Sequence, residues 1–122
     1  MERWTIHQPS AGRYSLRINH GGARFWCMFD YRLQPLPEFD GVKVELTTDA
    51  DTESAEWFPH LRLGILRGMD VMRERNCVWV GVRVEVCKIH THITDTTARS
   101  CEYYGFSFAI TELPRLGTPL LD

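Results

Sequence analysis

Two histidines and a carboxylate stand close together in the second half of the chain. His90 and His92 are two residues apart, and Asp95 follows three residues later, where an alternating segment gives way to a helical pattern. Residues two apart in a strand face the same side, and two histidines with a carboxylate are the ligand set of a non-haem metal site. The same residues fit an exposed turn whose acid caps a helix. The second interpretation is favoured, and no metal site is predicted.

Three carboxylates alternate along a polar stretch near the middle of the chain. Asp49, Asp51 and Glu53 have the spacing of the first ligands of a calcium loop. Such a loop also needs glycine at its sixth position and glutamate at its twelfth, where this chain has Ser54 and His60. The pattern therefore predicts a solvated acidic loop.

Four arginines follow the acidic loop and form a candidate basic face, namely Arg62, Arg67, Arg73 and Arg75. A solvated helix surface explains them, and so does a face that binds RNA phosphates or a protein. Both interpretations stay open.

The four cysteines contain no C-x-x-C pair, so their spacing does not predict a structural zinc site. They are Cys27, Cys77, Cys87 and Cys101. We expect them to be reduced and mostly buried, as small hydrophobic side chains.

Motifs of nucleophilic or metal-dependent catalysis are not present in the sequence. It contains no G-x-S-x-G and no H-E-x-x-H, and it has no G-x-x-x-x-G-K-[ST] loop to cradle phosphates. The sequence thus predicts a chain that is not an enzyme, binds no nucleotide and needs no cofactor.

Hydrophobic spacing predicts two helices. In residues 54–75, apolar side chains recur at steps of three and four and form one stripe, which includes Phe58, Leu61, Ile65, Met69 and Met72. Pro59 lacks an N–H and favours the first turn, so this helix is expected to begin near Ala55 or later. Gly64 and Gly68 suggest a close approach to a sheet. A second helix is expected after a cap at Thr94 or Asp95, and Pro114 should end it.

Alternating or continuous apolar runs predict the strands. These are residues 25–33, ended by Pro35, residues 41–47, and residues 78–90, where the valines from Val78 to Val86 and Lys88 share one side. Residues 1–24 are expected to form a lead-in, which is loosely ordered over residues 1–17. It is expected to contain at most one short strand, near residues 13–19. The order of elements predicts one domain over residues 1–122, an α+β two-layer sandwich with about four mixed strands and two helices on one face.

Size and composition fit a globular chain. It has 122 residues, of which 43% are hydrophobic and 25% charged, with a net charge of −2. No uncharged apolar run approaches the roughly 18 residues of a membrane span, so a cytoplasmic protein without membrane association is expected. The weak negative charge argues against a non-specific nucleic-acid binder, which is usually strongly basic.

Several motifs in the same order resemble domain IV of the translation elongation factor G family. Residues 56–69 follow the family helix pattern E-Y-I-P-A-V-x-x-G-I-x-x-A-M, with its proline and glycine in place. Residues 92–97, His-Ile-Thr-Asp-Thr-Thr, are similar to the family segment H-D-V-D-S-S. The Gly21-Gly22 pair, the strand at 82–86 and the Thr118-Pro119 exit resemble family features as well.

This resemblance implies a fold and a function. The fold would contain a left-handed βαβ crossover, and the domain would imitate the anticodon arm of tRNA at the small ribosomal subunit. The implied contact to RNA or the ribosome lies at the tip and comprises His90, His92, Thr94, Asp95 and Thr96. The family's glycine-rich loop before the helix is replaced here by residues 47–54, whose acids would repel RNA phosphates.

Three hypotheses remain. The first is a non-enzymatic module that binds the small ribosomal subunit or structured RNA. The second is a regulatory module that kept the fold and binds a protein partner instead. The third is a small metalloenzyme built on the tip histidines.

Overall fold

The computed structural model describes residues 2–16, 26–93 and 95–120. Four strands form the larger sheet in the order β2 (Ser10–Tyr14), β3 (Met28–Pro35), β6 (Val82–His90) and β4 (Val42–Leu46). β4 runs parallel to β6, and the other neighbours are antiparallel. The predicted strands at 25–33 and 41–47 are thus present as β3 and β4. β3 begins later than expected and includes Pro35.

A second sheet has three short strands in the order β5 (Cys77–Trp79), β1 (Glu2–Thr5) and β7 (Thr118–Pro119). β1 pairs in parallel with β5, a partner far along the sequence. The prediction of at most one strand near 13–19 was therefore wrong, because the lead-in contains both β1 and β2. Residues 17–19 lie outside the described part.

The strand predicted at 78–90 is interrupted. Gly81 has a backbone φ of +68°, a left-handed conformation that glycine adopts without strain, and the chain leaves one sheet for the other there. The unbroken alternation from Val78 to Val86 did not reveal this corner.

A bulge then shifts the alternation within β6. Tyr31 of β3 pairs with Val86 and Asp30 pairs with Lys88, so Cys87 is an additional residue on β6. The bulge places Ile89 in the core instead of Lys88. His90, the last residue of β6, therefore lies on the face of the sheet opposite Ile89 and the core.

α1 (Thr52–Glu74) is longer than predicted. Asp51 accepts the N–H of Ser54 at 2.7 Å and caps the helix, so the helix begins before Ala55. Pro59 lies two turns inside, and its ring is exposed. The apolar stripe is confirmed, since Leu61 and Ile65 are fully buried and the rest of the stripe packs against the core.

The second helical region extends past its predicted end. α2 (Ala98–Ser107) continues into a π-helical turn, η1 (Phe108–Glu112), and into α3 (Leu113–Leu116). Pro114 is accommodated at the start of α3, where a missing N–H costs little. The cap is Thr97, which shares a capping box with Ser100, and not Thr94 or Asp95.

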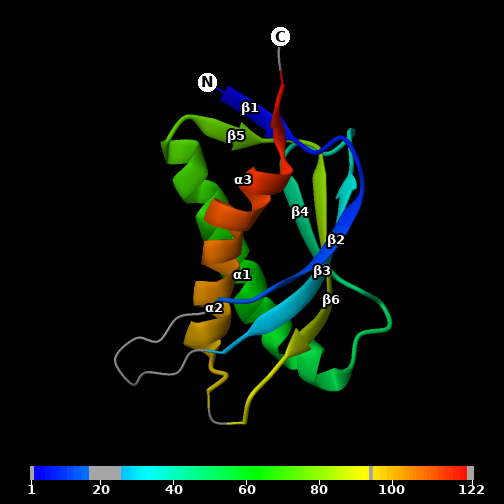
Figure 1. The fold of residues 1–122 in the computed structure, drawn as a ribbon, viewed down its shortest axis with the longest axis vertical. Coiled ribbons are helices and arrows are strands. Elements are labelled where there is room, and N and C mark those ends of the chain that lie inside the picture. The colour runs from blue at the N-terminus through cyan, green and yellow to red at the C-terminus, as the bar shows by residue number, and fades with distance from the viewer. Residues whose placement is uncertain (1, 17–25, 94, 121–122) are drawn as a thin grey trace.

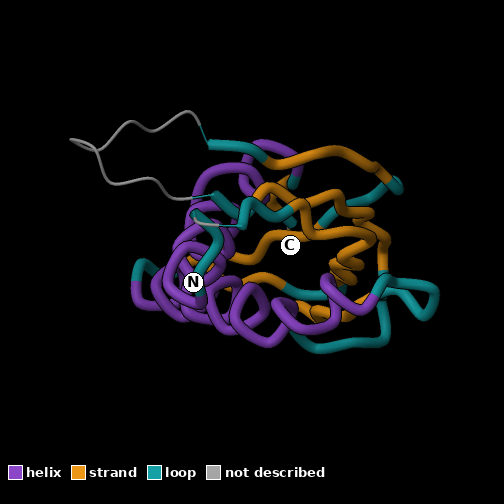
Figure 2. The backbone as a smooth tube through the Cα atoms, turned by 90° about the horizontal axis from the view of Figure 1, so that it is seen from below, coloured by secondary structure: helices purple, strands orange, loops and turns teal. Residues whose placement is uncertain are grey.

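The helices pack together on one face of the larger sheet (Figures 1 and 2). A Cβ built on Gly64 would lie 2.0 Å from the carbonyl oxygen of Glu102, and one on Gly105 would lie 2.3 Å from that of Leu61. The glycines therefore permit a close contact between α1 and α2, not the approach to a sheet that the sequence suggested.

The chain is an α+β protein with two mixed sheets. β4 connects to its parallel neighbour β6 through α1 and β5, and the termini lie at the end of the molecule with the small sheet (Figure 1). None of the helices in residues 2–16, 26–93 and 95–120 combines the length and the apolar character of a membrane-spanning segment.

Candidate functional site

The turn between β6 and α2 forms the end of the molecule opposite the termini (Figure 1). We call its described residues, 91–93 and 95–97, the tip turn. The main-chain carbonyl of His92 accepts the N–H groups of Asp95 at 3.2 Å and Thr96 at 3.0 Å. The tip turn is thus closed by its own backbone. Thr94, one of the predicted contact residues, lies outside the described part.

Thr96 joins the tip turn to the body of the protein. Its buried hydroxyl accepts the N–H of His92 at 2.7 Å and donates to the carbonyl of Trp26 at 2.8 Å. The N–H of Trp26 donates to the carbonyl of Asp95 at 3.3 Å. These bonds hold the tip turn against the segment that leads into β3.

Two side chains of the tip turn point outward. His92 is 51% exposed, and its Nδ1 lies 3.3 Å from a carboxylate oxygen of the more buried Asp95. Ile93 is 98% exposed. An imidazole beside a fully exposed apolar side chain offers a hydrogen-bonding group and a hydrophobic surface to a partner.

His90 does not join His92. Its Nε2 lies 3.0 Å from Asp30 on β3, whose other carboxylate oxygen accepts from Arg13 at 2.7 Å. Partial burial acts to raise the pKa of Asp30, but the hydrogen bonds from Arg13 and His90 outweigh it and hold that pKa below its usual value. His90 therefore belongs to a surface network between β2, β3 and β6.

The two histidines and Asp95, weighed above as a possible ligand set, are thereby separated. Within residues 2–16, 26–93 and 95–120, no group of three His, Cys, Asp or Glu side chains is arranged to hold a metal ion. His92 and Asp95 remain together in the tip turn, whereas His90 lies with Asp30.

The acidic loop lies next to the tip turn, and its carboxylates have partners of their own. Asp51 caps α1 and pairs with Lys88 at 3.1 Å; the hydrogen bonds from Ser54 and then Lys88 lower the pKa of Asp51 to about 2. Glu53 accepts the hydroxyl of Thr91, and Asp49 accepts that of Thr47 at 2.8 Å. These pairings partly offset the negative charge that the loop brings toward the tip turn.

The start of α2 is less available than the sequence suggested. The N–H of Thr97 donates to the hydroxyl of Ser100, and the N–H of Ser100 donates to that of Thr97. An uncapped helix start can offer such main-chain N–H groups to an anion, but here the capping box already uses those of Thr97 and Ser100.

The four arginines of the candidate basic face differ in their surroundings. Arg62 donates to the carbonyl of Val44 on β4, at 3.4 Å, and Arg67 pairs with Glu102 on α2. Arg73 lies in the last turn of α1 and is exposed, and Arg75 follows the helix as its C-cap. Two of the four are thus engaged in contacts within the protein.

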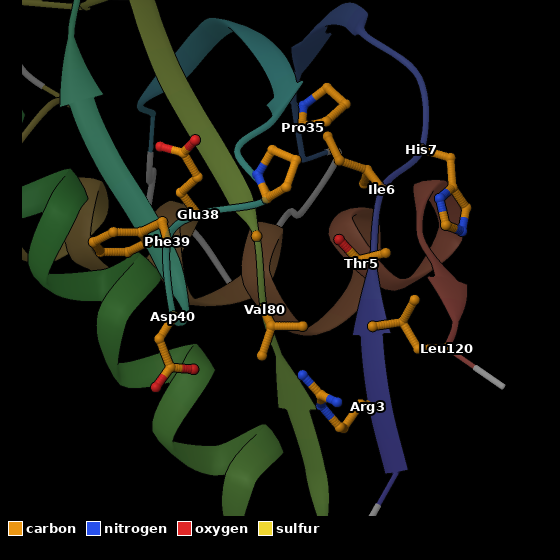
Figure 3. A pocket seen from close by; sticks show the side chains of 12 residues that line it. Arg3, Thr5, Ile6, His7, Pro35, Glu38, Phe39, Asp40, Val80 and Leu120 are labelled. Atoms are coloured by element: carbon orange, nitrogen blue, oxygen red, sulfur yellow. The ribbon is translucent and has the colours of Figure 1, made fainter. Parts of the chain in front are cut away.

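A pocket with a volume of about 520 Å³ lies at the opposite end of the molecule, and sequence reasoning missed it. Arg3 and Thr5 lie on its β1 side, Glu38, Phe39 and Asp40 lie across from them, and Val80 lies between (Figure 3). Its residues come from distant parts of the chain, so no local pattern could have predicted it.

Comparison with known proteins identifies the fold alone. No family model matches the chain, and no curated protein matches it. Among solved structures, the chain is similar to a crystal structure of a protein from Thermus thermophilus, with a TM-score of 0.65 and 15% identity over 97% of this chain. The match covers 18% of that protein, so this chain spans less than a fifth of its length.

Proposed function

We propose that this chain is a non-enzymatic module that contacts the small ribosomal subunit through RNA, with the tip turn as its contact surface. The observation that carries the proposal is the tip turn itself. It is closed by its own backbone, anchored through Thr96, and presents His92 and Ile93 at the end of the molecule far from both termini.

The exposed side chains suit unpaired RNA bases better than phosphates. Single-stranded bases are bound by stacking and by hydrogen bonds to their edges, and His92 offers a ring that can do both. Ile93 adds an apolar surface for a base or ribose. No cluster of cations among the described tip residues offers itself to phosphate, so recognition would depend on shape and base contacts.

The resemblance to domain IV of elongation factor G supports the same proposal. We propose that the chain has the two-layer arrangement of that domain, including its left-handed crossover. The parallel connection from β4 through α1 to β6 is consistent with it. The Thermus match, in which a similar fold forms less than a fifth of a longer chain, is consistent with a domain that also occurs inside larger proteins.

The test is cosedimentation of the purified chain with isolated small and large ribosomal subunits. We expect binding to the small subunit and a weak dependence on salt. One or two phosphate contacts would lower affinity by about 3- to 12-fold between 50 and 200 mM salt. The proposal fails if no binding occurs at 50 mM salt or if both subunits bind equally.

The pocket favours a second candidate, a module that binds a protein partner. Its volume lies within the range of small-molecule binding pockets, roughly 300–1,000 Å³. Within the described residues, no hydrogen bond or ion pair engages the side chains of Arg3, Glu38 or Asp40. A polar peptide segment would find both charge signs and Phe39 there. The test is an NMR titration of the chain with the protein fraction of a cell extract. Chemical-shift changes at the pocket residues Arg3, Glu38, Phe39 and Asp40, with none in the tip turn, would favour this candidate.

A further inference from the structure

Cys27 and Cys101 meet in the core behind the tip turn. Cys27 lies just before β3 and Cys101 in the first turns of α2, and both side chains are fully buried. Their sulfur atoms are 2.8 Å apart, although the residues are 74 positions apart in sequence. The sequence predicted four independent small hydrophobic residues and offered no reason to pair these two.

The geometry requires little movement to join them. A disulfide bond is about 2.0 Å long, so the two sulfurs need to approach by less than about 1 Å. The other two cysteines are partly exposed and lie apart, Cys77 in β5 and Cys87 at the bulge of β6. Within the described residues, neither of their sulfurs contacts another sulfur.

We propose that Cys27 and Cys101 form a reversible disulfide that fastens the tip turn to the core. The oxidant would be a low-molecular-weight disulfide such as oxidised glutathione. One cysteine thiolate attacks it, forming a mixed disulfide and releasing one small thiol. The second cysteine thiolate then attacks the mixed disulfide and displaces the other small thiol. The protein loses two protons and two electrons, and the small disulfide is reduced to two thiols.

The position of the pair links it to the tip turn. Trp26 precedes Cys27, and its carbonyl accepts the hydroxyls of Thr96 at 2.8 Å and Ser100 at 3.3 Å. Ser100 precedes Cys101. A covalent bond between the two cysteines would therefore hold Trp26 and Ser100 in place. Trp26 is the residue whose carbonyl anchors Thr96 of the tip turn. The disulfide does not depend on RNA binding, and either proposal can fail alone.

Burial makes the exchange slow. The hydrogen bond to Cys101 and then burial raise the pKa of the Cys27 thiol, so little of the reactive thiolate is present at neutral pH. Reagents reach fully buried sulfurs through local opening. We expect oxidation over hours, faster at alkaline pH, and equally slow reduction once the bond has formed.

The experiment uses the full chain in glutathione buffers of increasing oxidation, followed by alkylation of free thiols and peptide mapping by mass spectrometry. We expect Cys27 and Cys101 to be linked to each other with the loss of two hydrogen atoms, while Cys77 and Cys87 each carry either the alkylating group or one glutathione. The melting temperature of the oxidised protein should be about 5 °C or more above that of the reduced protein, because a crosslink that closes a long loop restrains the unfolded chain. Hydrogen exchange of the main-chain N–H groups of His92, Asp95 and Thr96 should slow.

Two variants serve as controls. The double variant Cys77→Ser with Cys87→Ser should still form the bond, and Cys101→Ala should not. Because the principal measurement uses the parent chain, it holds even if a core variant folds poorly. Cys27 and Cys101 that stay fully alkylatable in the most oxidising buffer, or a link to Cys77 or Cys87, would overturn the disulfide. A disulfide that leaves exchange in the tip turn unchanged would overturn its role in fastening that turn.

Discussion

The hydroxyl of Thr96 donates to the main-chain carbonyl of Trp26 at 2.8 Å, and this bond connects the tip turn to the segment that enters β3. The hydroxyl oxygen of Thr96 also accepts a hydrogen bond from the N–H of His92, at 2.7 Å. One buried side chain thus positions the exposed histidine of the proposed contact surface.

Replacing Thr96 by Val should lower the free energy of unfolding by roughly 1–3 kcal/mol, because the isosteric side chain removes the acceptor of the His92 N–H and leaves the carbonyl of Trp26 with the longer hydrogen bond from Ser100 alone. Urea denaturation measures the loss. Thr48→Val is the matched control, since Thr48 is exposed and makes no hydrogen bond to a described residue. Equal stability of the two variants would show that Thr96 does not anchor the tip turn.

Leu61 is fully buried in the stripe of α1 that faces the sheet. Leu61→Ala should cost about 2–5 kcal/mol of unfolding free energy, the range for a buried leucine. Leu63, on the same helix and 41% exposed, provides the control, and Leu63→Ala should cost under about 0.5 kcal/mol. A similar cost at both positions in urea denaturation would mean that the helix faces the core differently.

Gly64 should not tolerate alanine, although alanine favours helices by about 1 kcal/mol. The added Cβ would meet the backbone of α2 at Glu102, which cannot move aside without displacing the helix. We expect Gly64→Ala to destabilise the protein by roughly 1–3 kcal/mol. A rise in the thermal midpoint would instead show that α1 and α2 are less closely packed than the structure indicates.

Asp51 makes stability depend on pH in acid. Its pKa in the folded protein is about 2, below the ordinary 3.8, so its stabilising effect is present above about pH 4 and is lost as pH falls toward 2. In Asp51→Asn the amide can still cap α1 but does not titrate. Urea denaturation at pH 5 and pH 3 should therefore show a smaller loss of stability for Asp51→Asn than for the parent. A loss of the same size in both would exclude Asp51 as a source of the acid sensitivity.

The sequence predicted the parts of the fold whose signal is local. The apolar stripe of α1 and the alternation of β4 contain their own periodicity, and both appear in the structure. β2 pairs with the next strand, β3, and overlaps the predicted strand near 13–19 only at Arg13 and Tyr14. β1 was not predicted because its partner, β5, lies some 75 residues away along the chain. A short strand of this kind shows no pattern until its partner is known.

The candidate site was predicted by type but not by arrangement. His92, Asp95 and Thr96 do form one turn, yet the bulge at Cys87 places His90 with Asp30. A single extra residue in one strand reverses the side on which all later residues face. Neither the bulge nor the contact between Cys27 and Cys101 follows from spacing, since both depend on how separate elements pack.

The most direct test of the central claim compares His92→Ala with His7→Ala in cosedimentation with purified small ribosomal subunits. His7 is also exposed but lies at the opposite end, beside the pocket. Both variants should melt as the parent does, because a surface substitution usually changes the free energy of unfolding by less than about 0.5 kcal/mol.

If the tip turn contacts RNA, His92→Ala should weaken binding at least about fivefold, since one base contact contributes roughly 1–3 kcal/mol, while His7→Ala should bind as the parent does. Equal binding by His92→Ala and the parent, with both folded, would contradict the account and would favour the pocket as the surface that meets a partner.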